Sequence, residues 1–189
     1  MVSTFRLLTA DDLFHLPSDQ RCELIDGVLV DLSPPGPEHA GIAGRFTTLL
    51  GSHVLAEGLG EILVEPGIIV RREPDTVRAP DVAFVRADRI PDGGLPATFW
   101  DVVPDLVLEV VSPNDTQAEI QAKVREWVEA GVRLVLVAYP REHSVHAIRS
   151  LIDRQVLTGE DTLDARDIVP GFEFSVGFIF GPQRRATRA

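Results

Sequence analysis

Hydrophobic positions alternate with polar ones along much of the chain, in short runs separated by turn residues. CELI and VLVDL flank the pair Asp26-Gly27, which favours a tight type I′ turn and so predicts a hairpin. Residues 61–70 and 77–85 each read as one strand, with the charged turn RREPD between them. PDLVLEVV and RLVLVAY are apolar on both faces, which predicts strands buried on both sides, and the segments SVHAI and QVL follow as further strands.

Three segments show helical signals. A short helix is expected over Thr9–His15, with Thr9 as N-cap, and apolar residues at helical spacing predict another over residues 39–56. Thr116 and Glu119 have the spacing of a capping box and open a third helix, which Gly131 ends. One crossover helix among many strands predicts an α/β (α+β) fold with a mixed central β-sheet flanked by helices.

Length and composition are those of one soluble domain. The 189 residues are 44% hydrophobic, and no run approaches the roughly 18 apolar residues of a membrane span. We expect a single domain with its core over residues 9–180 and a flexible basic tail over 181–189. Cys22 is the only cysteine, and acidic residues near the N-terminus interrupt any apolar signal stretch, so a reducing cytoplasm is the expected location.

The charge of the chain restricts contact with nucleic acid to local sites. A net charge of −11 and a pI near 4.8 argue against a surface that attracts phosphates everywhere. Arg71, Arg72 and Arg78 form one basic cluster that could contact a nucleic acid, and the tail carries a second. Solvated surface charge is the alternative interpretation of both clusters.

Two acidic residues stand inside predicted strands. Glu109 lies in the apolar run LVLEVV, and Asp81 follows Pro80 in RAPDVAFV. An ionised carboxylate in an apolar interior costs several kcal/mol unless it is paired, protonated or bound to a metal. A turn cap for Asp81 and an arginine partner for Glu109 would explain them structurally. Two such acids at strand ends also suit a divalent cation such as Mg²⁺.

Lys123 falls at the edge of the inward face of the third helix, between the directions of Trp127 and Ala130. A lysine stem along an apolar surface, with its ammonium in water, is the simple interpretation. The short separation from Glu109 keeps a catalytic role open.

At these residues the sequence resembles the PD-(D/E)xK phosphodiesterase superfamily, and more closely its Uma-two family of restriction-endonuclease-like proteins. The resemblance covers residues 9–180 and depends on the order and spacing of several motifs together. They are CELIDGVLV with Glu23, SPPGPEHAGI with His39, RAPDVAFV with Asp81, PDLVLEVVSPND with Glu109, AKVREWVEAGV with Lys123, and PGFEFSV.

The resemblance implies a restriction-endonuclease-like core and a divalent metal, Mg²⁺ or Mn²⁺. Asp81, Glu109 and the main-chain carbonyl of Val110 would hold the metal. The superfamily places a lysine two residues after the glutamate, where this chain has Val111. The Uma-two family supplies its lysine from the following helix, and that position is Lys123.

Two further residues match family positions. Glu23 corresponds to an acidic residue near the metal, although an ordinary hairpin residue would also fit the pattern. His39 is a secondary candidate, since a histidine on the apolar face of a helix is also a common hydrogen-bonded core residue.

The expected function is metal-dependent hydrolysis of nucleic acid, DNA being the expected substrate, with Lys123 assisting the attacking water. The alternative is an inactive nuclease-fold module that serves as a dimeric binding or scaffold protein. A homodimer is expected in either case, with the apolar segments Phe99-Trp100 and 178–180 as candidate contacts.

Overall fold

The computed structural model describes residues 6–17 and 21–181. The predicted tail from residue 182 onward lies outside the described residues, together with its basic cluster Arg184, Arg185 and Arg188. In the described ranges, no helix has both the length and the apolar character needed to cross a membrane.

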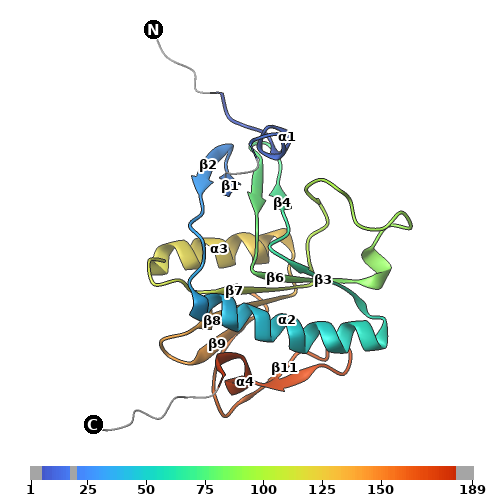
Figure 1. The fold of residues 1–189 in the computed structure, drawn as a ribbon, viewed down its shortest axis with the longest axis vertical. Helices are drawn as coiled ribbons and strands as arrows, with labels where there is room; N and C mark the ends of the chain where they lie inside the picture. The colour runs from blue at the N-terminus through green and yellow to red at the C-terminus, as the bar shows by residue number, and fades with distance from the viewer. Residues whose placement is uncertain (1–5, 18–20, 182–189) are drawn as a thin grey trace.

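A six-stranded mixed sheet forms the centre of the fold (Figure 1). Only β7 and β8 pair in parallel within it, because the crossover helix α3 joins them, and all its other neighbours pair antiparallel. The predicted α/β fold with a mixed sheet is therefore confirmed. The strands, in spatial order, are β10 (Arg154–Thr158), β9 (Ser144–Ile148), β8 (Leu134–Tyr139), β7 (Leu106–Val110), β6 (Val82–Arg86) and β3 (Gly60–Val64).

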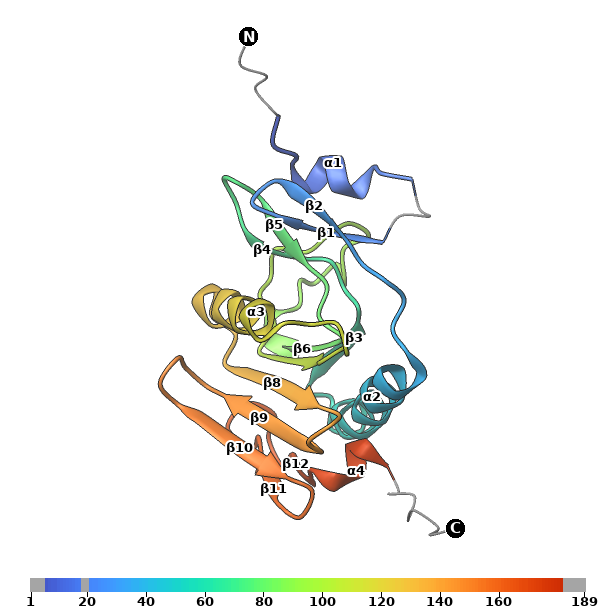
Figure 2. The same cartoon turned by 90° about the vertical axis from the view of Figure 1, so that its left-hand side faces the viewer.

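Helices α2 (Pro37–Glu57) and α3 (Gln117–Ala130) cover opposite faces of this sheet (Figure 2). The capping box predicted for α3 is present, and the left-handed Gly131 ends the helix as expected. On the α2 side the core also includes apolar residues from around the small sheet of β11 (Thr162–Asp164) and β12 (Glu173–Ser175), and from helix α4 (Gly177–Phe180). Strand β7 is thus buried on both faces, as its sequence predicts.

A second sheet of four strands lies beyond α3 (Figure 2). Helix α1 (Ala10–Phe14) shares a small apolar core with it and has Thr9 as its N-cap. Asp26 and Gly27 both have positive φ, so the predicted hairpin turn is confirmed. The strands of this sheet, in spatial order, are β2 (Val28–Asp31), β1 (Cys22–Ile25), β5 (Thr76–Arg78) and β4 (Ile68–Arg71).

The two long strands expected over 61–70 and 77–85 do not exist as single strands. Each divides into two, β3 with β4 and β5 with β6, and each half belongs to a different sheet. Glu65 has a φ of 49° and Pro66 follows it, which breaks the first segment. Pro80, which has no N–H to donate, breaks the second. As a result, Asp81 lies where the chain passes from one sheet to the other. A one-turn 3₁₀ helix, η1 (Ala87–Arg89), follows β6.

Candidate active site

The two strand carboxylates lie opposite each other at the junction of the sheets. Strands β6 and β7 pair with Val82 opposite Leu108, and the same register continued by one residue places Asp81 opposite Glu109. The main-chain N–H of Val110 donates to Oδ2 of Asp81 at 2.6 Å. Directly opposed residues of an antiparallel pair have Cβ atoms about 5 Å apart, so the two carboxylates share one site.

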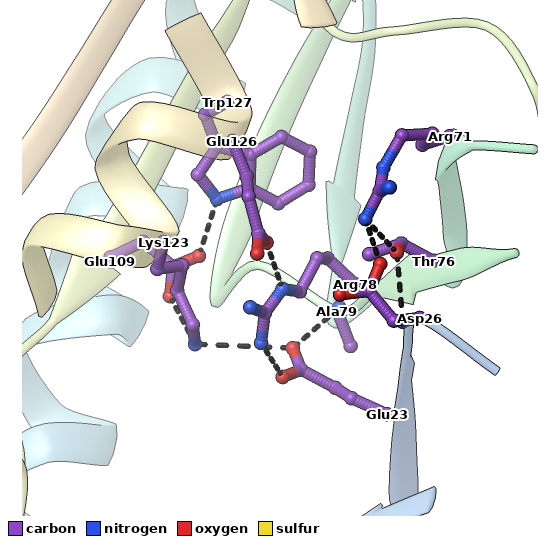
Figure 3. A network of polar contacts seen from close by, with 10 residues as sticks. All are labelled: Glu23, Asp26, Arg71, Thr76, Arg78, Ala79, Glu109, Lys123, Glu126 and Trp127. Atoms are coloured by element: carbon purple, nitrogen blue, oxygen red, sulfur yellow. Dashed lines mark hydrogen bonds and ion pairs between the residues drawn. The ribbon is translucent and has the colours of Figure 1, made fainter. Parts of the chain in front are cut away.

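Helix α3 supplies two hydrogen-bond donors to Glu109 (Figure 3). Nζ of Lys123 lies 3.3 Å from Oε2, and the indole Nε1 of Trp127 donates to Oε1 at 2.8 Å. Lys123 and Trp127 are four residues apart and therefore lie on the same face of the helix. The predicted approach of Lys123 to Glu109 is found in the structure, and Lys123 is the only lysine in the sequence.

Glu23 reaches the same site from strand β1 of the other sheet and is buried. Its Oε1 accepts from the main-chain N–H of Ala79 at 3.0 Å and lies 3.9 Å from Nζ of Lys123. Its Oε2 accepts from Arg78 at 2.7 Å, and Arg78 also donates to Glu126 on α3. The structure therefore brings together Glu23, Asp81, Glu109 and Lys123, which come from both sheets and one helix.

Burial sets the protonation of the two strand carboxylates. It raises the pKa of Asp81 to about 6 against the opposing effects of the Val110 N–H and Lys123. Burial likewise raises the pKa of Glu109 to about 7, with the charge of Asp81 adding to the increase. Burial alone would lower the pKa of Lys123, but Glu109 and Glu23 outweigh it and raise that pKa above its ordinary value. Lys123 therefore stays a cation, while the nearby carboxyl groups of Asp81 and Glu109 ionise at a higher pH than free carboxyl groups do.

His39, near the start of α2, reaches Asp81 from the opposite side. Its Nε2 lies 3.4 Å from Oδ2 of Asp81, and the carbonyl of Val110 also faces the ring and raises its pKa. Burial, the larger effect, lowers the pKa of His39. Nδ1 is buried and has no hydrogen-bond partner among the described residues, which fits a neutral ring. His39 and the Val110 carbonyl thus both lie next to Asp81.

The site carries more negative than positive charge. Within the described part of the chain, no cluster of three or more His, Cys, Asp or Glu side chains has the arrangement of a metal site. A centre of two carboxylates and one main-chain carbonyl does not need such a cluster, because Mg²⁺ keeps several waters. When ionised, the side chains of the network carry two more negative than positive charges, a difference that a divalent cation matches. They are Glu23, Asp81, Glu109 and Glu126 against Arg78 and Lys123.

Two cavities adjoin this site. One of about 330 Å³ is lined in part by His39, Val111 and Tyr139, beyond the ends of β7 and β8. The other, of about 210 Å³, is lined in part by Glu23 and Arg78. The first cavity thus reaches His39, which lies beside Asp81, and the second reaches Glu23, which lies beside Lys123.

The three arginines of the predicted basic cluster do not share one surface. Arg71 pairs with Asp26 and also donates to Thr76, while Arg72 pairs with Asp75 on the turn after β4. The side chain of Arg78 is only 7% exposed.

The apolar segments expected at a dimer contact differ in exposure. Trp100 is buried, whereas Phe178 is 55% exposed.

Sequence reasoning missed the roles of Glu126, Trp127 and Arg78. The spacing from Lys123 was the available signal for the first two, because residues three and four positions along a helix share its face. Nothing in the local sequence around Arg78 indicates that it turns inward.

A family model described as "Uma2: Putative restriction endonuclease" matches residues 10–177. The chain belongs to the Uma2 family. The match includes each of Glu23, His39, Asp81, Glu109 and Lys123, so the resemblance seen in the motifs is confirmed for the family as a whole.

The Uma2 chain also has the fold of a solved structure from Anabaena variabilis, described as "a putative nuclease belonging to DUF820". The two share 20% sequence identity and superpose with a TM-score of 0.79, over 92% of this chain and 97% of the other. At this identity the likeness shows the fold alone. A search of curated proteins found no match.

Proposed function

We propose that this Uma2 protein is a metal-dependent phosphodiesterase that cleaves nucleic acid, with DNA as the expected substrate. The observation that carries the proposal is the buried pair Asp81 and Glu109, with the cationic Lys123 beside it. Both carboxyl groups are mostly shielded from water, with 15% and 13% of the side chain exposed, and both have raised pKa values, as acid groups in functional sites often do. Membership of a family described as restriction endonucleases supports the same reaction class.

Asp81, Glu109 and the carbonyl of Val110 would hold the divalent cation, Mg²⁺ or Mn²⁺. Such a cation supplies Lewis-acid polarisation of the phosphate and a lowered pKa for bound water. Trp127 and the Val110 N–H each donate to one carboxylate and fix its orientation. Because these donors already orient the two carboxylates, the side chains would rearrange little when the cation binds.

Lys123 would position the attacking water or stabilise the negative charge that develops on the phosphate. Its ammonium already lies between Oε2 of Glu109 and Oε1 of Glu23, so its location does not depend on substrate. Glu23 would limit the movement of Lys123 and complete the acidic surroundings of the cation. His39, next to Asp81, would keep that carboxylate in place as a neutral group.

Excess negative charge at the site explains why a cation would be needed before a phosphate can bind. Glu65 and Asp115 add to the field at Asp81 and raise its pKa further. A phosphodiester anion meets net repulsion there until a divalent cation offsets that negative charge.

The test is a nuclease assay on single- and double-stranded DNA and RNA, with Mg²⁺ or Mn²⁺ and with EDTA. Wild-type protein is expected to cleave at least one substrate only with the metal. Asp81→Ala and Lys123→Ala are each expected to lose about 100-fold or more in rate, and the exposed Asp92→Ala serves as the matched control. Cleavage that survives both active-site substitutions would overturn the proposal.

The same preparation separates the enzyme from the inactive binding module. Titration calorimetry with Mn²⁺ should show a binding site that Asp81→Ala removes. Absence of both Mn²⁺ binding and cleavage in the folded wild type would favour the module. Sedimentation at micromolar concentration tests the expected homodimer separately.

A further inference from the structure

Arg78 joins the two halves of the site. Its side chain is buried, its Nη1 donates to Oε2 of Glu23 at 2.7 Å, and its Nε donates to Oε2 of Glu126 at 2.6 Å (Figure 3). Glu23 belongs to strand β1, and Glu126 follows Lys123 by three residues on helix α3. One guanidinium therefore connects the four-stranded sheet to the helix that carries Lys123.

Arg78 also contacts the carboxylate through which Glu23 meets Lys123. One oxygen of Glu23 accepts from Arg78, and the other accepts from the N–H of Ala79 and faces Nζ of Lys123 at 3.9 Å. Glu109 contacts the same ammonium at 3.3 Å. If Glu23 moved, Lys123 would keep only one of its two carboxylate neighbours. Glu23 thus links Arg78 to the ammonium.

We propose that Arg78 is a positioning residue for Lys123, acting through Glu23, with Glu126 as its anchor on α3. The consequence for catalysis rests on the proposed phosphodiesterase function, whereas the effect on Lys123 itself does not. The role requires the planar guanidinium, because two donors on one rigid group reach two carboxylates. Arg78→Lys would retain the positive charge but would lose the planar group that donates to Glu23 and Glu126 together.

The first measurement follows Lys123 directly. Because it is the only lysine of the chain, ¹⁵N-lysine labelling gives one side-chain ammonium signal in the NMR spectrum. Arg78→Gln and Glu126→Gln are expected to shift or broaden that signal. Two substitutions on exposed positions of the same helix, Arg125→Gln and Glu129→Gln, should leave it unchanged.

Circular dichroism verifies that each variant is folded. If Arg78→Gln fails to fold, Glu126→Gln decides the question. It keeps the buried ion pair of Arg78 with Glu23 and removes only the charge of the anchor on α3. An ammonium signal that stays at its wild-type position in a folded Arg78→Gln or Glu126→Gln protein would overturn the proposal.

The second measurement is kinetic. Arg78→Lys is expected to lower kcat by about 10- to 100-fold, the loss that a misplaced catalytic group causes, with KM nearly unchanged. In a Lys123→Met background, Arg78→Lys should have no further effect, because Arg78 acts through Lys123. Independent effects that multiply in the double variant, or wild-type rates in Arg78→Lys, would contradict positioning. If the wild type cleaves nothing, the proposed function fails and the NMR result alone decides the role of Arg78.

Discussion

Removing the charge of Asp81 is expected to stabilise the metal-free protein. The side chain is 15% exposed, and its folded-state pKa of about 6 lies above the ordinary value of 3.8. A carboxyl group with a raised folded pKa favours the folded state most below its unfolded pKa and loses that contribution as the pH rises through the folded value. At pH 8 the ionised form therefore destabilises the fold.

The magnitude follows from the two pKa values. One pKa unit corresponds to about 1.4 kcal/mol, so Asp81→Asn should gain about 3 kcal/mol at pH 8 and about 1 kcal/mol at pH 4.5. For a chain of this length the larger value is a rise in Tm of about 6 to 12 °C. Loss of the Asp81 charge also relieves Glu109, whose pKa it raises, which acts in the same direction.

Urea denaturation in EDTA, followed by circular dichroism at several pH values, measures the effect. Asp92→Asn, an exposed acid on the loop after η1, is the matched control and should change stability little. Added Mn²⁺ should stabilise the wild type, by about 2.7 kcal/mol at 100 times Kd, and leave Asp81→Asn unaffected. The reasoning is refuted if Asp81→Asn is less stable than wild type at pH 8 in EDTA, or if the difference does not vary with pH.

Three further substitutions test the site and the packing of the fold. Trp127→Phe removes the donor to Oε1 of Glu109 and should cost about 2 kcal/mol in urea denaturation, and most of that cost should vanish in a Glu109→Gln background. Trp100→Phe, at the other buried tryptophan, is the control. If its cost in stability fell as much in the Glu109→Gln background, the effect of Trp127→Phe could not be assigned to the hydrogen bond with Glu109. Gly60→Ala should prevent stable folding, because Gly60 has a φ of 152° and a Cβ there would collide with the backbone of β6. A thermal melt of Gly60→Ala like that of wild type would disprove this expectation. Gly44→Ala, in the middle of α2 with open space around the position, should stabilise by about 0.5 to 1 kcal/mol, and a lower Tm would count against it.

Local signals in the sequence predicted α3 and the centre of the sheet well. The capping box at Thr116, the stop at Gly131 and the apolar faces of β7 each depend on neighbouring residues only. The same local logic placed Glu109 inside the sheet and Lys123 near it, because the two are joined by one tight crossover. Asp81 was found in the same way, as an acid among apolar residues after Pro80, and the family motifs then added Glu23.

The remaining features depend on contacts between distant segments. The breaks after β3 and β5 fall at Pro66 and Pro80, which hydropathy alone does not register, but the assignment of each half to a different sheet depends on the distant strands with which it pairs. Arg78 resembles Arg71 and Arg72 in the sequence, yet it is buried because Glu23 and Glu126 meet it from two other elements. Such an ion-pair network is set by tertiary structure, because Glu126 and Glu23 lie 48 and 55 residues from Arg78 in the sequence.

Anomalous diffraction from crystals soaked in Mn²⁺ tests the central claim most directly. We expect a manganese peak within bonding distance of both Asp81 and Glu109, with Val110 contributing its carbonyl and Lys123 alongside. The peak should be absent from crystals of Asp81→Asn soaked in the same way. A fully soaked wild-type crystal with no peak between these two carboxylates, or with manganese bound only elsewhere, would contradict the account.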